Sequence, residues 1–178
     1  MRMKRFATAT LLLSITCLGG LAQAESGSAR AIIPWEGEGR VFQVGPNTLQ
    51  FLGAFEGIMY IETVAGALNE AFIRCPVVQE LDIKEGTTSA EGHCMITGEG
   101  GDTVYADWNC TGKPGGCTGK FELTGGTGKF EGAKGSSVFK VRSPIRALAG
   151  NVASGSVLRV AAGLAELPEL KYELPNKK

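Results

Sequence analysis

The sequence predicts an all-β domain, and most simply an antiparallel β-barrel of about eight strands. Three observations support this prediction: runs of strand length alternate apolar and polar residues, glycine-rich turns join these runs, and helical stretches are few. The chain has 178 residues, of which 26 are glycine, about twice the usual share. Fourteen of them fall between Gly86 and Gly135. That density suits the tight turns, bulges and bends that close a sheet into a barrel.

Alternation with a period of two is the evidence for the individual strands. It is clearest over residues 117–124, where Cys117, Gly119, Phe121 and Leu123 alternate with polar residues. Residues 67–73 fit either a helical turn or a strand. The other stretches that we expect to be strands are residues 39–44, 49–53, 58–63, 88–97, 102–108 and 136–141.

The first 24 residues have the composition of a bacterial secretory signal peptide. A basic start is followed by an apolar run from Phe6 to Leu18 and by Ala22-Gln23-Ala24, which has small residues where a signal peptidase reads. The apolar run is shorter than the roughly 20 residues that span a bilayer. We therefore expect no membrane span and an exported protein, periplasmic or extracellular.

Cleavage after Ala24 would divide the remaining chain into three parts. We expect an N-terminal arm at residues 25–38, with Trp35 packed against the body, and the barrel at residues 39–163. The tail at residues 164–178 contains two prolines, and it fits a final strand, a short packed segment or a disordered end.

Charge and composition exclude several classes of protein. The whole chain has 18 basic and 18 acidic residues, and 43% of its residues are hydrophobic. Three basic residues and no acidic ones lie in the first 24 positions, so the mature chain has a net charge of 15 − 18 = −3. These values exclude a disordered acidic chain, and they imply neither a nucleic-acid partner nor a membrane-surface partner.

Four cysteines remain after the signal peptide: Cys75, Cys94, Cys110 and Cys117. An even number of cysteines in an exported chain indicates two disulfides, with three possible connectivities. The turn-rich stretch between Cys110 and Cys117 favours that pair, which leaves Cys75 with Cys94. We expect no metal, since no C-x2-C pair is present and the single histidine, His93, lies beside Cys94.

The most specific motif is the glycine-rich stretch from Gly125 to Gly135, GGTGKFEGAKG. It lacks the spacing of a P-loop and the third glycine of a dinucleotide fingerprint, so we expect no nucleotide cofactor. It resembles the G-G-T-G-x-F-x-x-A-x-G motif of the allene oxide cyclase-like barrel group, which includes dirigent proteins and exported bacterial proteins. The resemblance implies an eight-stranded antiparallel barrel with a central cavity, and it implies no activity. The glycines of the motif indicate a structural role, with Phe130 as an apolar plug beside them.

The residues that could line a cavity depend on strand register, because a slip of one residue inverts every side chain. If Val104, Ala106 and Trp108 point inward, Trp108 belongs to the core, whereas the opposite register would place Tyr105 and Asp107 in the cavity. The sequence shows no recognisable catalytic pair and no G-x-S-x-G elbow. The candidate ligand-binding residues are therefore Tyr60, His93, Tyr105, Asp107, Trp108 and Glu122.

Three functions fit these observations. We favour an exported barrel that binds a small hydrophobic ligand or acts as an accessory envelope protein, with a small apolar molecule as its partner. A cyclase-like or dirigent-like enzyme, which would guide a reactive substrate in an apolar cavity, follows from the family analogy alone. A structural or adhesive surface protein is the third.

Overall fold

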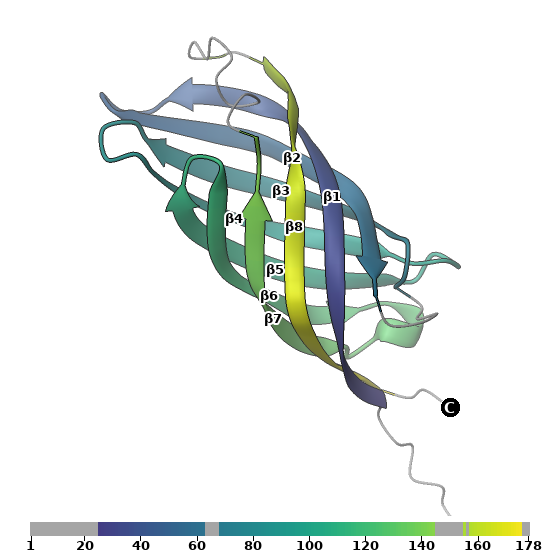
Figure 1. The fold of residues 1–178 in the computed structure, drawn as a ribbon. Helices are drawn as coiled ribbons and strands as arrows, with labels where there is room; N and C mark the ends of the chain where they lie inside the picture. The colour runs from purple at the N-terminus through teal and green to yellow at the C-terminus, as the bar shows by residue number, and fades with distance from the viewer. Residues whose placement is uncertain (1–24, 63–67, 145–154, 156, 176–178) are drawn as a thin grey trace, which may run out of the picture.

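The computed structural model describes residues 25–62, 68–144, 155 and 157–175, and in it the chain folds into a closed antiparallel barrel (Figure 1). The strands follow one another round the barrel in chain order, and the last strand pairs with the first. This confirms the predicted all-β class and the antiparallel barrel. The elements are β1 (Glu25–Gln43), β2 (Thr48–Ile61), β3 (Ala71–Asp82), β4 (Thr87–Thr97), β5 (Thr103–Lys113), β6 (Gly116–Gly126), the short 3-10 helix η1 (Gly128–Phe130), β7 (Lys134–Arg142) and β8 (Val157–Leu174).

Alternate side chains point into the barrel, as the period-2 patterns predict. In β6, Phe121 and Leu123 are buried, while Lys120 before them and Glu122 between them are exposed. In β5, the buried face is the one that contains Trp108, so the structure decides the register that the sequence left open. The interior is thus apolar, and the charged residues lie on the outer face.

The two ends of the barrel differ, and we call them the mouth and the base. The mouth is the end where the turns β1–β2, β3–β4 and β5–β6 lie, and the base is the end with η1 and the described ends of the chain, Glu25 and Pro175 (Figure 1). At the mouth, Pro114 and Gly115 join Lys113 to its partner Gly116. Gly115 has a φ of 94°, which the third position of a type II turn requires after proline.

The base is filled by side chains. Phe130 in η1 is buried and closes this end, as the glycine-rich motif predicts. Two hydrogen bonds hold the motif against β5: the Thr127 N–H donates to the Thr103 carbonyl, and the Thr103 N–H donates to the Thr127 hydroxyl. Above Phe130 lies a layer of fully buried residues, which includes Met59, Ile96, Val104 and Leu167.

The strand boundaries differ from the sequence prediction at both ends of the barrel domain. Residues 25–38 form most of β1 and pair with both β2 and β8, instead of forming a separate arm. Residues 164–174 belong to β8, which was one of the alternatives for the tail. The reason is closure: β1 and β8 supply the pairing that removes both free edges of the sheet. The expected signal peptide at residues 1–24 lies outside the described residues.

The stretches at 49–53 and 58–63, expected as two strands, belong largely to one strand, β2, which ends at Ile61. A glycine between these two stretches permits close approach of β1: a Cβ at Gly57 would lie 2.2 Å from the carbonyl oxygen of Pro34. A glycine here therefore marks strand contact and not a turn. The segment at residues 67–73 fits either a helical turn or a strand in the sequence. In the structure, residues 68–70 form a turn and β3 begins at Ala71.

None of the helices among the described residues is long and apolar enough to cross a membrane.

Candidate ligand cavity

An apolar cavity of about 140 Å³ occupies the half of the barrel interior nearer the mouth. Residues from all eight strands contribute to its wall, and it extends to the β5–β6 turn at Pro114 and Gly115. The fully buried residues of the base, such as Met59 and Leu167, do not contribute to it. The cavity therefore lies between the plugged base and the mouth.

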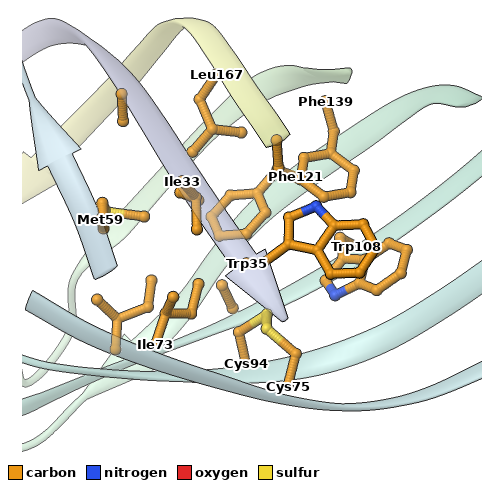
Figure 2. Packing of buried hydrophobic residues seen from close by; sticks show 14 of the residues in the cluster. Ile33, Trp35, Met59, Ile73, Cys75, Cys94, Trp108, Phe121, Phe139 and Leu167 are labelled. Carbon is orange, nitrogen blue, oxygen red and sulfur yellow. A yellow bond between two sulfur atoms is a disulfide. The ribbon is translucent and has the colours of Figure 1, made fainter. Parts of the chain in front are cut away.

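Six aromatic side chains line the cavity and contact one another across strands that are far apart in the sequence. The ring centroids of Trp35 and Phe55 lie 4.5 Å apart, and those of Trp108 and Phe139 lie 5.0 Å apart. Figure 2 shows both tryptophans beside Phe121 and Phe139 in the interior. We call this set the aromatic cluster; its members are Trp35, Phe51, Phe55, Trp108, Phe121 and Phe139.

Two disulfides form part of the same wall. Cys75 in β3 is bonded to Cys94 in β4, and Cys110 in β5 is bonded to Cys117 in β6. These are the pairs that the turn-rich spacing favours. All four cysteines line the cavity, and three of them are buried. The disulfides thus link β3 to β4 and β5 to β6 in the wall of the cavity.

Polar groups are few in the wall, and most of them have partners. The amide of Gln79 donates a hydrogen bond to the Thr88 hydroxyl at 3.0 Å, and that hydroxyl donates to the carbonyl of Glu80 at 2.8 Å. The carboxylate of Glu56 contacts Arg74 at 2.7 Å, with both side chains about half exposed on the outer face. The Ser143 hydroxyl donates to the carbonyl of Ala162. No carboxylate among the described residues is thus buried in the cavity without a partner.

The structure brings one of the six candidate residues into the cavity. Trp108 is buried and lines it. The other five point outward, and three of them, His93, Asp107 and Glu122, lie side by side on β4, β5 and β6. The five are Tyr60, His93, Tyr105, Asp107 and Glu122.

His93 and Asp107 form an exposed pair on the outer face. The imidazole Nδ1 and the carboxylate Oδ1 lie 2.7 Å apart. This hydrogen bond raises the pKa of His93 above its usual value, and the negative charges of Asp107 and, more weakly, Glu91 act in the same direction. The His93 side chain is 83% exposed. The pair therefore lacks the enclosure that general acid–base catalysis uses to shift a pKa for a reaction.

The sequence pattern does not show that Trp35, Phe51, Phe55, Phe121 and Phe139 form one cluster. One signal identifies two members of the cluster, Trp108 and Phe121. All four cysteines line the interior, and side chains alternate along a strand. Each cysteine therefore shows which other residues of its strand point inward. Cys110 places Trp108 inward and Asp107 outward, and Cys117 does the same for Phe121 and Glu122.

No three histidine, cysteine, aspartate or glutamate side chains of the described residues gather as a metal site would require. No protein-family model, curated protein or solved structure matches this chain. The eight-stranded antiparallel barrel agrees with the fold that the resemblance to allene oxide cyclase-like barrels implies. Membership of that group stays a prediction.

Proposed function

We propose that this protein is an exported barrel that binds a small apolar molecule in the cavity near its mouth. The observation that carries the proposal is the cavity itself, about 140 Å³ in volume and walled by six aromatic side chains and two disulfides. An apolar interior under a charged exterior is the arrangement of small barrels that enclose one ligand.

The cavity volume sets the size of the ligand. An apolar cavity of roughly 150 Å³ in a protein core stays free of water and accepts a molecule as large as benzene. The volume here is close to that value, so a molecule with one aromatic ring or a short hydrocarbon chain fits. Larger molecules would have to extend out through the mouth.

The wall supports binding more than catalysis. The Gln79 amide and the Thr88 hydroxyl hydrogen-bond each other, and the Glu56 carboxylate is paired with Arg74 on the outer face. A cyclase-like reaction would need an acid or a base turned toward the substrate. We therefore place the enzyme hypothesis second to simple binding.

Export is part of the proposal and has two supports. The two disulfides suit an oxidising compartment, and residues 1–24 have the composition of a signal peptide. Expression of the full chain in a bacterium, followed by intact mass measurement of the periplasmic fraction, tests this. Cleavage after Ala24 is expected, and a cytoplasmic protein that keeps its first 24 residues would contradict it.

Titration calorimetry with toluene tests the binding itself. At ~0.8 kcal/mol for each buried carbon group, burying toluene yields at most about 5–6 kcal/mol, which corresponds to a Kd on the order of 0.1 mM. Ala90 lies in β4 and lines the cavity, so Ala90→Phe fills part of it and is expected to abolish toluene binding. Ser89 is its exposed neighbour on the same strand. Ser89→Phe is the matched control, and we expect this variant to retain toluene binding. Absence of saturable binding to the folded wild-type protein would contradict the proposal and favour a structural role.

A further inference from the structure

A short hydrogen-bonded chain lies in the wall of the cavity, near the mouth. The Thr88 hydroxyl donates to the carbonyl oxygen of Glu80 at 2.8 Å, and the amide nitrogen of Gln79 donates to the same hydroxyl at 3.0 Å. Gln79 and Thr88 both line the cavity. Thr88 is 6% exposed, and Gln79 is half-buried. A polar pair held at a fixed place in an apolar wall is the kind of group that small-molecule sites use to orient a ligand.

The hydrogen bonds determine which end of the Gln79 carboxamide is free. A hydroxyl has one proton, and Thr88 donates it to a carbonyl oxygen, which can only accept. The hydroxyl must therefore accept from Gln79, so the amide nitrogen faces Thr88 and the amide oxygen Oε1 points away from it. Turning the amide over would place two acceptors against each other.

The oxygen Oε1 of Gln79 is free to accept a hydrogen bond. Among the described residues, only the nitrogen of this amide has a partner. One fully buried side-chain nitrogen or oxygen of these residues lacks a partner, and it belongs to Trp35 and not to Gln79. Oε1 is therefore not sealed inside the protein, and a ligand atom can reach it.

Strand register places Gln79 beside the aromatic cluster. Its direct neighbours are Phe51 on β2 and Ala90 on β4, and both of them line the cavity. Side chains alternate along β3, and Gln79 lies on the same face as the buried residues Cys75 and Val77. Gln79 thus points into the barrel between the cluster and the mouth. A ligand that packs against Phe51 has its outer end near this amide.

We propose that the ligand carries a hydroxyl group, which donates to Oε1 of Gln79 while its apolar part fills the cavity. The ligand class is then a small phenol or alcohol and not a plain hydrocarbon. A group that only accepts, such as an ether or carboxylate oxygen, would cover Oε1 without pairing it, and an unpaired buried acceptor costs free energy. This inference rests on the proposed binding function and adds the polar contact that orients the ligand.

Phenol and toluene are a matched pair of probes, because a hydroxyl in one replaces a methyl group in the other. Their Kd values are measured by calorimetry for the wild-type protein, Gln79→Met and Gln50→Met. Methionine keeps the unbranched length of glutamine and removes the amide. Gln50 precedes Phe51 in β2, bonds Glu80 on the outer face and does not line the cavity, so Gln50→Met is the matched control. The ratio of the two Kd values is compared between proteins, so that the different solvation of the two probes cancels.

We expect Gln79→Met to shift the Kd ratio by about threefold to tenfold against phenol, the effect of losing one ordinary hydrogen bond. Gln50→Met should leave the ratio within twofold of the wild-type value. A shift of less than twofold in Gln79→Met, or an equal shift in both variants, would overturn the inference, while binding of toluene would leave the proposed function intact. Failure of both probes to bind the folded wild-type protein would instead refute the proposed function.

An NMR measurement on the wild-type protein keeps the inference testable if Gln79→Met does not fold. A hydrogen bond accepted by Oε1 withdraws electron density from the nitrogen of the same amide. Phenol is therefore expected to move the assigned side-chain nitrogen signal of Gln79 downfield, and toluene is not. Equal shifts with both probes would overturn the inference.

Discussion

Removal of each disulfide should destabilise the barrel by an amount that depends on the length of the loop it closes. Cys75 and Cys94 are 19 positions apart, and Cys110 and Cys117 are seven apart. In the chain-entropy description, a cross-link stabilises by restricting the unfolded chain, more so for the longer loop. Loops of these lengths give about 3.2 kcal/mol for the first disulfide and about 2.4 kcal/mol for the second.

The comparison of two double variants tests this difference. Cys75→Ala with Cys94→Ala should cost roughly 0.8–0.9 kcal/mol more than Cys110→Ala with Cys117→Ala. Packing acts in the same direction, because Cys75 and Cys94 are both buried whereas Cys117 is half-buried. The entropic gap is therefore a lower bound.

Urea unfolding, followed by circular dichroism and by tryptophan fluorescence, measures both variants. The two probes should give one transition, and the dependence of the unfolding free energy on urea should be compared for the two variants before the free energies are subtracted. An equal loss in both variants, or a larger loss in the Cys110–Cys117 variant, would refute the loop-length reasoning. The stability of the barrel would then depend on local packing at the mouth more than on restriction of the unfolded chain.

Three further predictions concern separate parts of the barrel. Gly119→Ala in β6 should prevent folding, since the new Cβ would lie 1.9 Å from a backbone oxygen of β5, while Gly45→Ala should be tolerated because its nearest neighbour is the rotatable Thr48 hydroxyl at 3.3 Å; circular dichroism decides between them. NMR titration should give His93 a pKa above its usual value of about 6.5, and Asp107→Asn should lower it. Because the folded pKa is raised, any stabilisation by this pair is present below about pH 6.5 and is lost as the pH rises through the folded pKa. Phe130→Ala at the base should cost about 3–5 kcal/mol in unfolding free energy and leave the Kd for toluene within twofold, because Phe130 does not line the cavity.

The period-2 pattern predicted the middle of the barrel well. The inward set of β6 at Phe121 and Leu123 and that of β4 at Cys94 and Ile96 are both as the alternation indicates. These strands have one apolar and one polar face, so the alternation shows which side chains point into the barrel. The glycine-rich motif likewise indicated a structural element with Phe130 as its plug.

The pattern failed where closure of the barrel determines the structure. Residues 25–38 contain small and polar residues and a proline, and they look like an arm until β8 is present to pair with them. Gly57 in β2, between the two stretches predicted as separate strands, permits close contact with β1, which a sequence cannot distinguish from a turn. Tertiary pairing, and not local propensity, decides such segments.

The candidate site was harder to predict, because its residues meet across strands. Trp35 and Trp108 belong to β1 and β5, and no local spacing relates them. Five of the six residues predicted from chemical type alone point outward in the structure. The positions of the four cysteines are the signal that would have shown which residues of β5 and β6 point inward.

The most direct test of the central claim is a crystal structure of the mature protein under xenon pressure. Xenon enters apolar cavities that are empty of water and accessible from outside. The account predicts a xenon atom inside the barrel among Trp35, Phe55 and Trp108. Side chains that fill this space, or ordered water molecules in place of xenon, would contradict an apolar ligand cavity and leave the barrel as a structural scaffold.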